Sequence, residues 1–373
     1  MPEVGDRGGL VEPVVWLDAR TRFNRFMNYR DVDRPPFYEW LGYWSQTVNR
    51  WYGEGLPPGV NVHDYFGFDR REGIPLDFDP IPSFIPKLIE EDDRYVVWQS
   101  TFGIVCKDLK VSTSMPNFIE FPVKKPEDWE MLKPRFNPHD PRRLPKYWGE
   151  GLFEYYRSLS HPLGMGFTGF FGFARNLMGL QRLLVAFYRE PELVRDIMDH
   201  WAWFCVEMAR TVLSRVRVDY AAIWEDMAYN RGPHISPRLF EEFMLPCYRR
   251  LTSTLKSHGV ELIMVDTDGN FETLIPLFIE GGVNCFYPLE AASRMDAVKL
   301  REEYGRGLRL IGNVDKRALA AGPKAIDKEL ERVKPLIEEG GYIVSVDHCV
   351  PADVPFNHYV YYINKVKKMY GLS

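Results

Sequence analysis

The clearest pattern in the chain is a series of short apolar runs, each followed by polar, titratable residues. Residues 261–265 (ELIMV) form the sharpest run, and Asp266, Asp268 and a Gly-Asn turn come directly after it. Continuous apolar runs of this length are typical of parallel strands that are buried on both faces. The other runs that we interpret as strands are residues 164–169, 218–224, 283–289, 308–311 and 342–346.

Stretches with helical periodicity separate these runs. The predicted helices cover residues 177–187, 191–216, 237–257, 271–280, 296–304, 324–339 and 357–370. Regular alternation of strand and helix predicts right-handed βαβ crossovers and a parallel sheet. About six such units follow residue 162, and one or two more precede it. The predicted fold is therefore an α/β fold of the (β/α)8 TIM-barrel type. The dinucleotide-binding open sheet is disfavoured because no Gly-x-Gly-x-x-Gly follows any strand.

The N-terminal part is less regular. Residues 1–15 are expected to be loose, and the aromatic stretch 37–44 (FYEWLGYW) is a candidate first strand. Residues 56–150 are rich in proline and charge, with a hairpin pattern over 95–111. We interpret the chain as one barrel domain, 1–373, with an N-terminal extension and with 56–150 as an insertion or lid.

Composition and charge limit the classes of binding partner that we expect for this chain. The net charge is -5, so nothing favours nucleic acid or an anionic membrane. No basic leader and no run of about 18 apolar residues is present, so neither a signal peptide nor a membrane span is predicted. Five scattered cysteines without CxxC indicate a reduced, cytoplasmic setting. The sequence leaves a homodimer open.

The residues that could carry chemistry lie at the predicted strand ends. Asp266, Asp268 and His348 would offer two oxygens and one nitrogen to a divalent metal such as zinc. Glu225 or Glu290 could add a ligand or serve as a general base. The alternative is ordinary turn chemistry, in which Asp side chains cap the following helix.

Candidate substrate contacts surround this set. Arg231 and His234, on the loop after 218–224, would either touch a substrate anion or only solvate the loop. The glycine-rich loop 166–172 lacks the ending of a nucleotide P-loop. We expect it instead to let the backbone approach a flat ligand that Phe170 and Phe171 flank. The aromatic residues that could form the opposite wall, or else pack beneath the mouth, are Tyr38, Trp40, Tyr43 and Trp44.

Several motifs occur in a fixed order along the chain. They are residues 33–36 (DRPP), 235–237 (ISP), 266–270 (DTDGN), 312–315 (GNVD) and 348–355 (HCVPADVP). With these motifs, residues 20–370 resemble the uroporphyrinogen decarboxylase-like superfamily. The resemblance implies a (β/α)8 barrel whose site lies at the C-terminal mouth. It also implies one of two activities: porphyrinogen decarboxylation, or methyl transfer to or from a corrinoid protein.

Departures from the family pattern favour the second activity. The true decarboxylases carry an arginine-rich segment after Arg-Pro-Pro, whereas residues 37–44 here contain no arginine and one acid. A substrate with many carboxylates would find no positive charge to bind it in this segment at the barrel mouth. The thiol-methylating members bind zinc through His and Cys ligands, and Asp266, Asp268 and His348 stand in those places here. Such a harder ligand set suits the polarisation of an ether oxygen.

The resemblance therefore implies a metal-dependent methyltransferase of the O-demethylase type. It would move a methyl group from a methoxylated, aromatic compound to a corrinoid carried by a partner protein. The alternatives are a decarboxylase of uroporphyrinogen or another carboxylate, and a non-catalytic protein that binds a corrinoid or tetrapyrrole.

Overall fold

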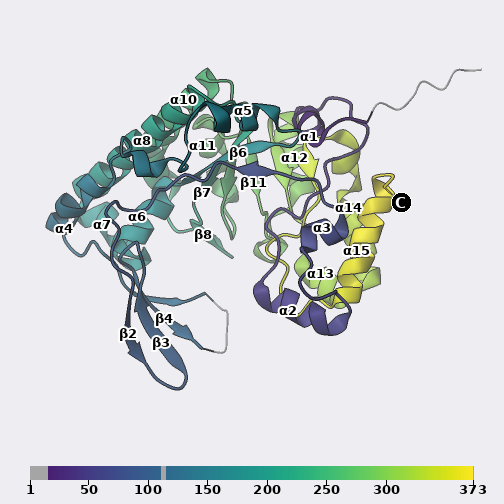
Figure 1. The fold of residues 1–373 in the computed structure, drawn as a ribbon, viewed down its shortest axis with the longest axis horizontal. Helices are drawn as coiled ribbons and strands as arrows, with labels where there is room; N and C mark the ends of the chain where they lie inside the picture. The colour runs from purple at the N-terminus through teal and green to yellow at the C-terminus, as the bar shows by residue number, and fades with distance from the viewer. Residues whose placement is uncertain (1–15, 111–114, 373) are drawn as a thin grey trace, which may run out of the picture.

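A computed structural model describes residues 16–110 and 115–372, so the expectation of a loose 1–15 segment lies outside the described residues. Its centre is a curled, seven-stranded parallel sheet in the order β1-β6-β7-β10-β11-β12-β13 (Figure 1). The strands are β1 Glu72–Gly73, β6 Leu163–Thr168, β7 Tyr220–Trp224, β10 Leu262–Asp266, β11 Cys285–Tyr287, β12 Arg309–Ile311 and β13 Tyr342–Ile343. The predicted α/β class and barrel type are confirmed.

The stretch 37–43 lies between the two edge strands. Near β1, the Asp69 amide donates to the Phe37 carbonyl oxygen over 2.9 Å. On the other side, the Trp40 amide donates to Ser345 Oγ, two residues after β13, over 2.9 Å. This stretch bridges the two edges, although it does not form the regular strand that was predicted.

A buried carboxyl group fastens this stretch. Glu39 accepts hydrogen bonds from Ser345 Oγ, from the Val346 amide over 3.1 Å and from the Tyr359 hydroxyl over 2.9 Å. Burial raises the pKa of Glu39 to about 7, against the effect of these hydrogen bonds. Contacts between residues about 300 positions apart therefore close the barrel.

Helices follow the strands as predicted. Figure 1 shows α6, α7, α8 and α10 on one side of the molecule and α13, α14 and α15 on the other. The helices are α1 Ala19–Met27, α2 Ser45–Glu54, α3 Val62–Phe66, α4 Pro126–Leu132, α5 Glu150–Ser158, α6 Phe170–Met178, α7 Leu180–Arg189, α8 Pro191–Leu213, α9 Pro237–Leu239, α10 Leu245–Ser257, α11 Ile275–Glu280, α12 Ala297–Tyr304, α13 Lys316–Ala321, α14 Pro323–Glu339 and α15 Phe356–Met369. The single helix predicted over 237–257 contains a π-helical turn, Phe240–Met244, just before Pro246. Proline has no amide hydrogen to continue the helical ladder, which accounts for this irregularity.

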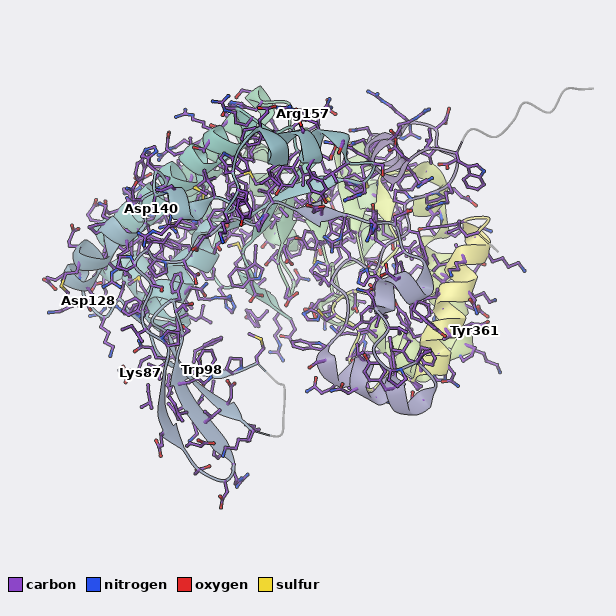
Figure 2. The ribbon with its side chains drawn as sticks, in the orientation of Figure 1. Lys87, Trp98, Asp128, Asp140, Arg157 and Tyr361 are labelled. Atoms are coloured by element: carbon purple, nitrogen blue, oxygen red, sulfur yellow. The ribbon has the colours of Figure 1, made fainter. Side chains whose placement is uncertain are left out.

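The predicted insertion is partly a piece of the barrel. Within 56–150, β1 pairs with β6 of the main sheet. The part that leaves the barrel is a four-stranded antiparallel sheet, which projects from the body in Figure 1 and carries Lys87 and Trp98 in Figure 2. Its strands are β2 Lys87–Glu91, β3 Tyr95–Gln99, β4 Val105–Leu109 and β5 Asn117–Glu120. The predicted hairpin corresponds to β3 and β4.

The inside of the barrel is a packed core rather than a pore. Phe23 and Met27 of α1 pack there against Tyr38, Trp40 and Tyr220. A second, larger core lies between the sheet and its helices. Within the described ranges, no helix has both the length and the apolar character needed to cross a membrane.

Candidate active site

Strand β10 delivers the first acids to the C-terminal mouth. Its other residues are buried, and Asp266 at its end is partly exposed. The next turn needs glycine, because Gly269 has a φ of +78° and a Cβ there would lie 2.6 Å from the carbonyl carbon of Ala228. The close contact places Asp268 beside the β8–β9 hairpin (Ala228–Tyr229 and Gly232–Pro233).

Asp268 and His348 form a hydrogen-bonded pair across this mouth. His348 Nε2 lies 3.3 Å from Asp268 Oδ2. The indole of Trp44 stacks on the imidazole with ring centroids 6.1 Å apart and an interplanar angle of 17°. The hydrogen bond to Asp268, followed by one to Cys349, raises the pKa of His348 to about 10. His348 is therefore an imidazolium at neutral pH.

Asp266 has the opposite character. Burial, and then the neighbouring carboxylates of Asp268 and Asp226, raise its pKa to about 8, and the positive charge of His348 opposes them only in part. Asp266 consequently keeps its proton at neutral pH. A carboxylic acid that is protonated near pH 7 and lies at a barrel mouth is suited to general-acid chemistry.

A partly buried ion pair supports the turn that carries Asp268. Glu290 accepts a hydrogen bond from the Gly269 amide over 3.0 Å and pairs with Lys316 Nζ at 2.9 Å. Asp347 accepts from the Lys316 amide over 3.0 Å, and burial raises its pKa to about 6 against the charge of Lys316. Glu290, predicted as a ligand or base, therefore holds the turn in place.

The three residues expected to bind a metal lie at the same end of the barrel but not in one tight cluster. Asp266, Asp268 and His348 share one mouth, as predicted. However, no group of three His, Cys, Asp or Glu residues in the described ranges lies close enough together to hold a metal ion. Asp268 and His348 instead form a hydrogen bond with each other, and binding of a metal by Asp266, Asp268 and His348 stays a prediction.

Glu225 and the two phenylalanines belong to the core. Glu225 is fully buried and accepts from the Phe170 amide over 2.9 Å, the Gly172 amide over 3.0 Å and the Tyr248 hydroxyl over 2.5 Å. Burial raises the pKa of Glu225 to about 7. Phe170 and Phe171 start helix α6 and are also buried, because the glycine-rich stretch forms a strand and a helix instead of an open loop. This burial favours a structural role for all three residues, and their predicted catalytic and substrate-binding roles stay untested.

Three of the four predicted wall residues pack elsewhere. Tyr38 and Trp40 are buried in the barrel interior beneath the mouth. The hydroxyl of Tyr43 lies 2.9 Å from that of Tyr359, in the core beside α15. These positions match the packing alternative, and Trp44 is the member of the group that contacts a residue of the site.

The two predicted substrate contacts on the loop after β7, His234 and Arg231, lie in different surroundings. His234 stacks between Phe171 at 6.1 Å and Tyr229 at 5.5 Å, and burial lowers its pKa. His234 therefore packs the hairpin against the barrel, which favours the structural alternative, and its contact with a substrate stays a prediction. Arg231 is exposed on the rim, where contact with an anion stays a prediction.

Two important residues were not predicted. Asp226, with a φ of +50°, contributes to the raised pKa of Asp266 and pairs with Arg175 at 3.0 Å. Lys316 comes directly after the 312–315 motif, and this position in the sequence could have marked it as a residue of the site. No sequence pattern indicated the role of Asp226, because its positive φ is uncommon for a residue other than glycine.

The fold and the site together define an α/β barrel protein with a protonated acid, an ion pair and a partly buried lysine at its C-terminal mouth. The model of the uroporphyrinogen decarboxylase (URO-D) family matches residues 106–369, and the chain belongs to this family. The predicted superfamily is confirmed.

Two known proteins show how far the similarity reaches. A uroporphyrinogen decarboxylase from Syntrophotalea carbinolica is 24% identical over 201 residues, which cover 52% of this chain and 54% of that protein. The chain thus spans about half the length of this curated relative. A methyltransferase from Methanosarcina mazei superposes over 94% of this chain and 98% of its own, with a TM-score of 0.59 and 15% identity. The second similarity shows a shared fold.

Proposed function

We propose that the chain is a methyltransferase that takes a methyl group from a small methyl ether and passes it to a corrinoid held by a partner protein. The observation that carries the proposal is the position of Asp266 at the barrel mouth beside the Asp268–His348 pair, where burial and then the neighbouring carboxylates raise the pKa of Asp266 to about 8. The fold shared with the methyltransferase from Methanosarcina mazei is in keeping with it. A methoxylated aromatic compound fits the indole of Trp44 at the same mouth.

The residues solve the main difficulty of the reaction, which is a poor leaving group. When the bond between the ether oxygen and the methyl carbon breaks, the oxygen keeps the bonding electrons and becomes an alkoxide or phenoxide. Asp266 donates its proton to that oxygen, so the departing product is a neutral alcohol or phenol. The imidazolium of His348, held by Asp268, stabilises negative charge that develops before the proton has moved. The electron pair for the new bond to the methyl carbon would come from the reduced corrinoid when it is bound.

The test is methyl transfer with purified protein, a panel of methyl ethers and a reduced corrinoid, followed by the change in the visible spectrum. Replacement of Asp266 by Asn removes the proton donor, so we expect kcat to fall at least roughly a hundredfold. Glu130→Gln, on the surface helix α4, is the matched control and should not change kcat. Equal rates for Asp266→Asn and wild type would refute the role of Asp266.

The name of the curated relative raises a second candidate, decarboxylation of a carboxylated substrate. The carboxylates of Asp226 and Asp268 at the mouth disfavour a substrate with many carboxylates. Release of carbon dioxide from a porphyrinogen by the purified protein, without methyl transfer from any ether, would favour this candidate instead.

A further inference from the structure

A hollow on the rim of the barrel has a composition that the proposed reaction does not explain. It has a volume of about 520 Å³, within the size range of small-molecule sites, and its lining residues are Asn230, Arg231, Asn270, Ala292 and Arg294. These residues come from the loops that follow β7, β10 and β11. The hollow therefore opens at the same end of the barrel as Asp266 and Asp268.

The hollow is cationic, and its charge is not neutralised. No acid lines it, and neither Arg231 nor Arg294 forms an ion pair with any residue of the described ranges. By contrast, Arg175 at the same end of the barrel pairs with Asp226. Two guanidinium groups in one hollow, with no acid lining it, are suited to binding an anionic ligand.

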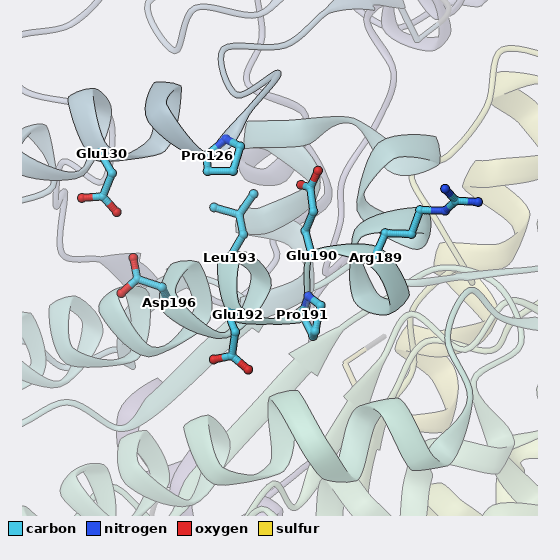
Figure 3. A pocket seen from close by; sticks show the side chains of 8 residues that line it. All are labelled: Pro126, Glu130, Arg189, Glu190, Pro191, Glu192, Leu193 and Asp196. Atoms are coloured by element: carbon cyan, nitrogen blue, oxygen red, sulfur yellow. The ribbon is translucent and has the colours of Figure 1, made fainter.

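A second hollow shows the opposite arrangement. It lies between α4 and the junction of α7 and α8, and its lining includes one arginine, Arg189, whose side chain points away from the lining carboxylates in Figure 3. The lining carboxylates are Glu130, Glu190, Glu192 and Asp196. An arginine in a surface hollow is thus not enough to make the hollow cationic, and the rim hollow differs in lacking acids.

The rim hollow is held in a fixed position relative to the candidate active site. Asn270, two residues after Asp268, donates from its amide to the Tyr229 carbonyl oxygen over 2.8 Å. Its side-chain Nδ2 donates to the Ser293 carbonyl oxygen over 2.9 Å. Arg294 adopts a φ of +65°, a conformation that a residue other than glycine rarely keeps without a local constraint. An anion bound in the hollow would therefore sit at a defined place beside the Asp268 turn.

We propose that Arg231 and Arg294 form an oxyanion site that binds a carboxylate of the small molecule whose other end occupies the mouth. The methyl donor is then a monoanion, held at its carboxylate by the rim while its ether oxygen faces Asp266. The identity of the bound molecule as methyl donor rests on the proposed function, whereas the binding of its carboxylate does not.

Binding to the full chain tests this site without any turnover. The probes are 4-methoxybenzoate, its neutral analogue 4-methoxybenzyl alcohol, and inorganic phosphate, each titrated calorimetrically at low ionic strength. We expect the benzoate to bind more tightly than the alcohol, and the Arg231→Gln/Arg294→Gln double variant to weaken benzoate binding by roughly tenfold or more. Added salt should weaken it as well, because both guanidinium groups are exposed to solvent.

The controls separate this inference from its alternatives. Arg189→Gln removes an arginine from the acidic hollow and should leave benzoate binding unchanged. Unchanged benzoate binding in the double variant, with the melting temperature preserved, would overturn the site. Phosphate binding that depends on both arginines, without any such benzoate binding, would also overturn it, because the hollow would then serve free phosphate. Arginine-dependent benzoate binding without methyl transfer would support the site and count against the proposed function alone.

Discussion

The protonated state of Asp266 can be measured through stability. In Asp266→Asn the amide has nearly the same shape but cannot ionise. The folded wild type holds a proton on Asp266 up to a pKa of about 8, whereas the unfolded chain releases it near the ordinary pKa of 3.8. Between these values the folded state binds more protons, so the stability of the wild type must decrease as the pH rises.

The size of the effect follows from the two pKa values. One proton difference changes the free energy of unfolding by about 1.4 kcal/mol per pH unit, so the wild type should lose about 2.5 kcal/mol between pH 5 and pH 7 relative to the variant. Above a pH of about 8 both states are ionised and the difference should level off. Below a pH of about 4 both are protonated, and the difference should level off there too.

Urea denaturation of both proteins at several pH values between about 5 and 8 gives this difference directly. Taking the difference between the two proteins cancels the titration of all other groups that behave alike in both. Circular dichroism and intrinsic fluorescence should give coincident transitions if unfolding is two-state. A difference that does not change with pH would show that Asp266 has an ordinary pKa, and the proposed general acid would be lost with it.

Three further predictions concern the surroundings of Asp266. Asp268→Asn replaces the carboxylate, whose hydrogen bond is the largest contribution to the raised pKa of His348, with a neutral amide, so an NMR titration should find that pKa shifted down toward 6.5; an unchanged titration would contradict the pairing. Glu225→Ala leaves three buried donors without an acceptor and should lower the free energy of unfolding by at least about 3 kcal/mol, as measured in urea; a loss below about 1 kcal/mol would argue against its structural role. Gly269→Ala forces a Cβ against the backbone of Ala228 at positive φ, so we expect a loss of about 2 kcal/mol together with impaired methyl transfer; unchanged stability would contradict the tight turn.

The barrel could be predicted because its signals are local. An apolar run such as 261–265 ends in acids wherever a buried strand meets the mouth, and helical periodicity marks the segment that leads to the next strand. The order of these elements was enough to predict a parallel sheet. The bridging stretch 37–43 was harder to interpret, because its hydrogen bonds go to residues such as Asp69 and Ser345 that no local pattern connects with it.

The site was predicted less completely, because sequence reports which residues reach a strand end but not which way they turn. Glu225 and Asp226 are neighbours at the end of β7, yet Glu225 points into the core and Asp226 affects the acid at the mouth. The sequence likewise could not show that Asp268 and His348 satisfy each other. Such pairings depend on distances between side chains from different strands.

The fastening of Glu39 to Ser345 and Tyr359 has a consequence for how the protein is made. During synthesis the N-terminal stretch leaves the ribosome long before its partners near position 350 exist. Until then the apolar face of that stretch has nothing native to cover it, and such unsatisfied surfaces recruit chaperones or aggregate. We therefore expect premature termination anywhere before the last two helices to yield insoluble fragments, rather than a shortened protein with a working mouth.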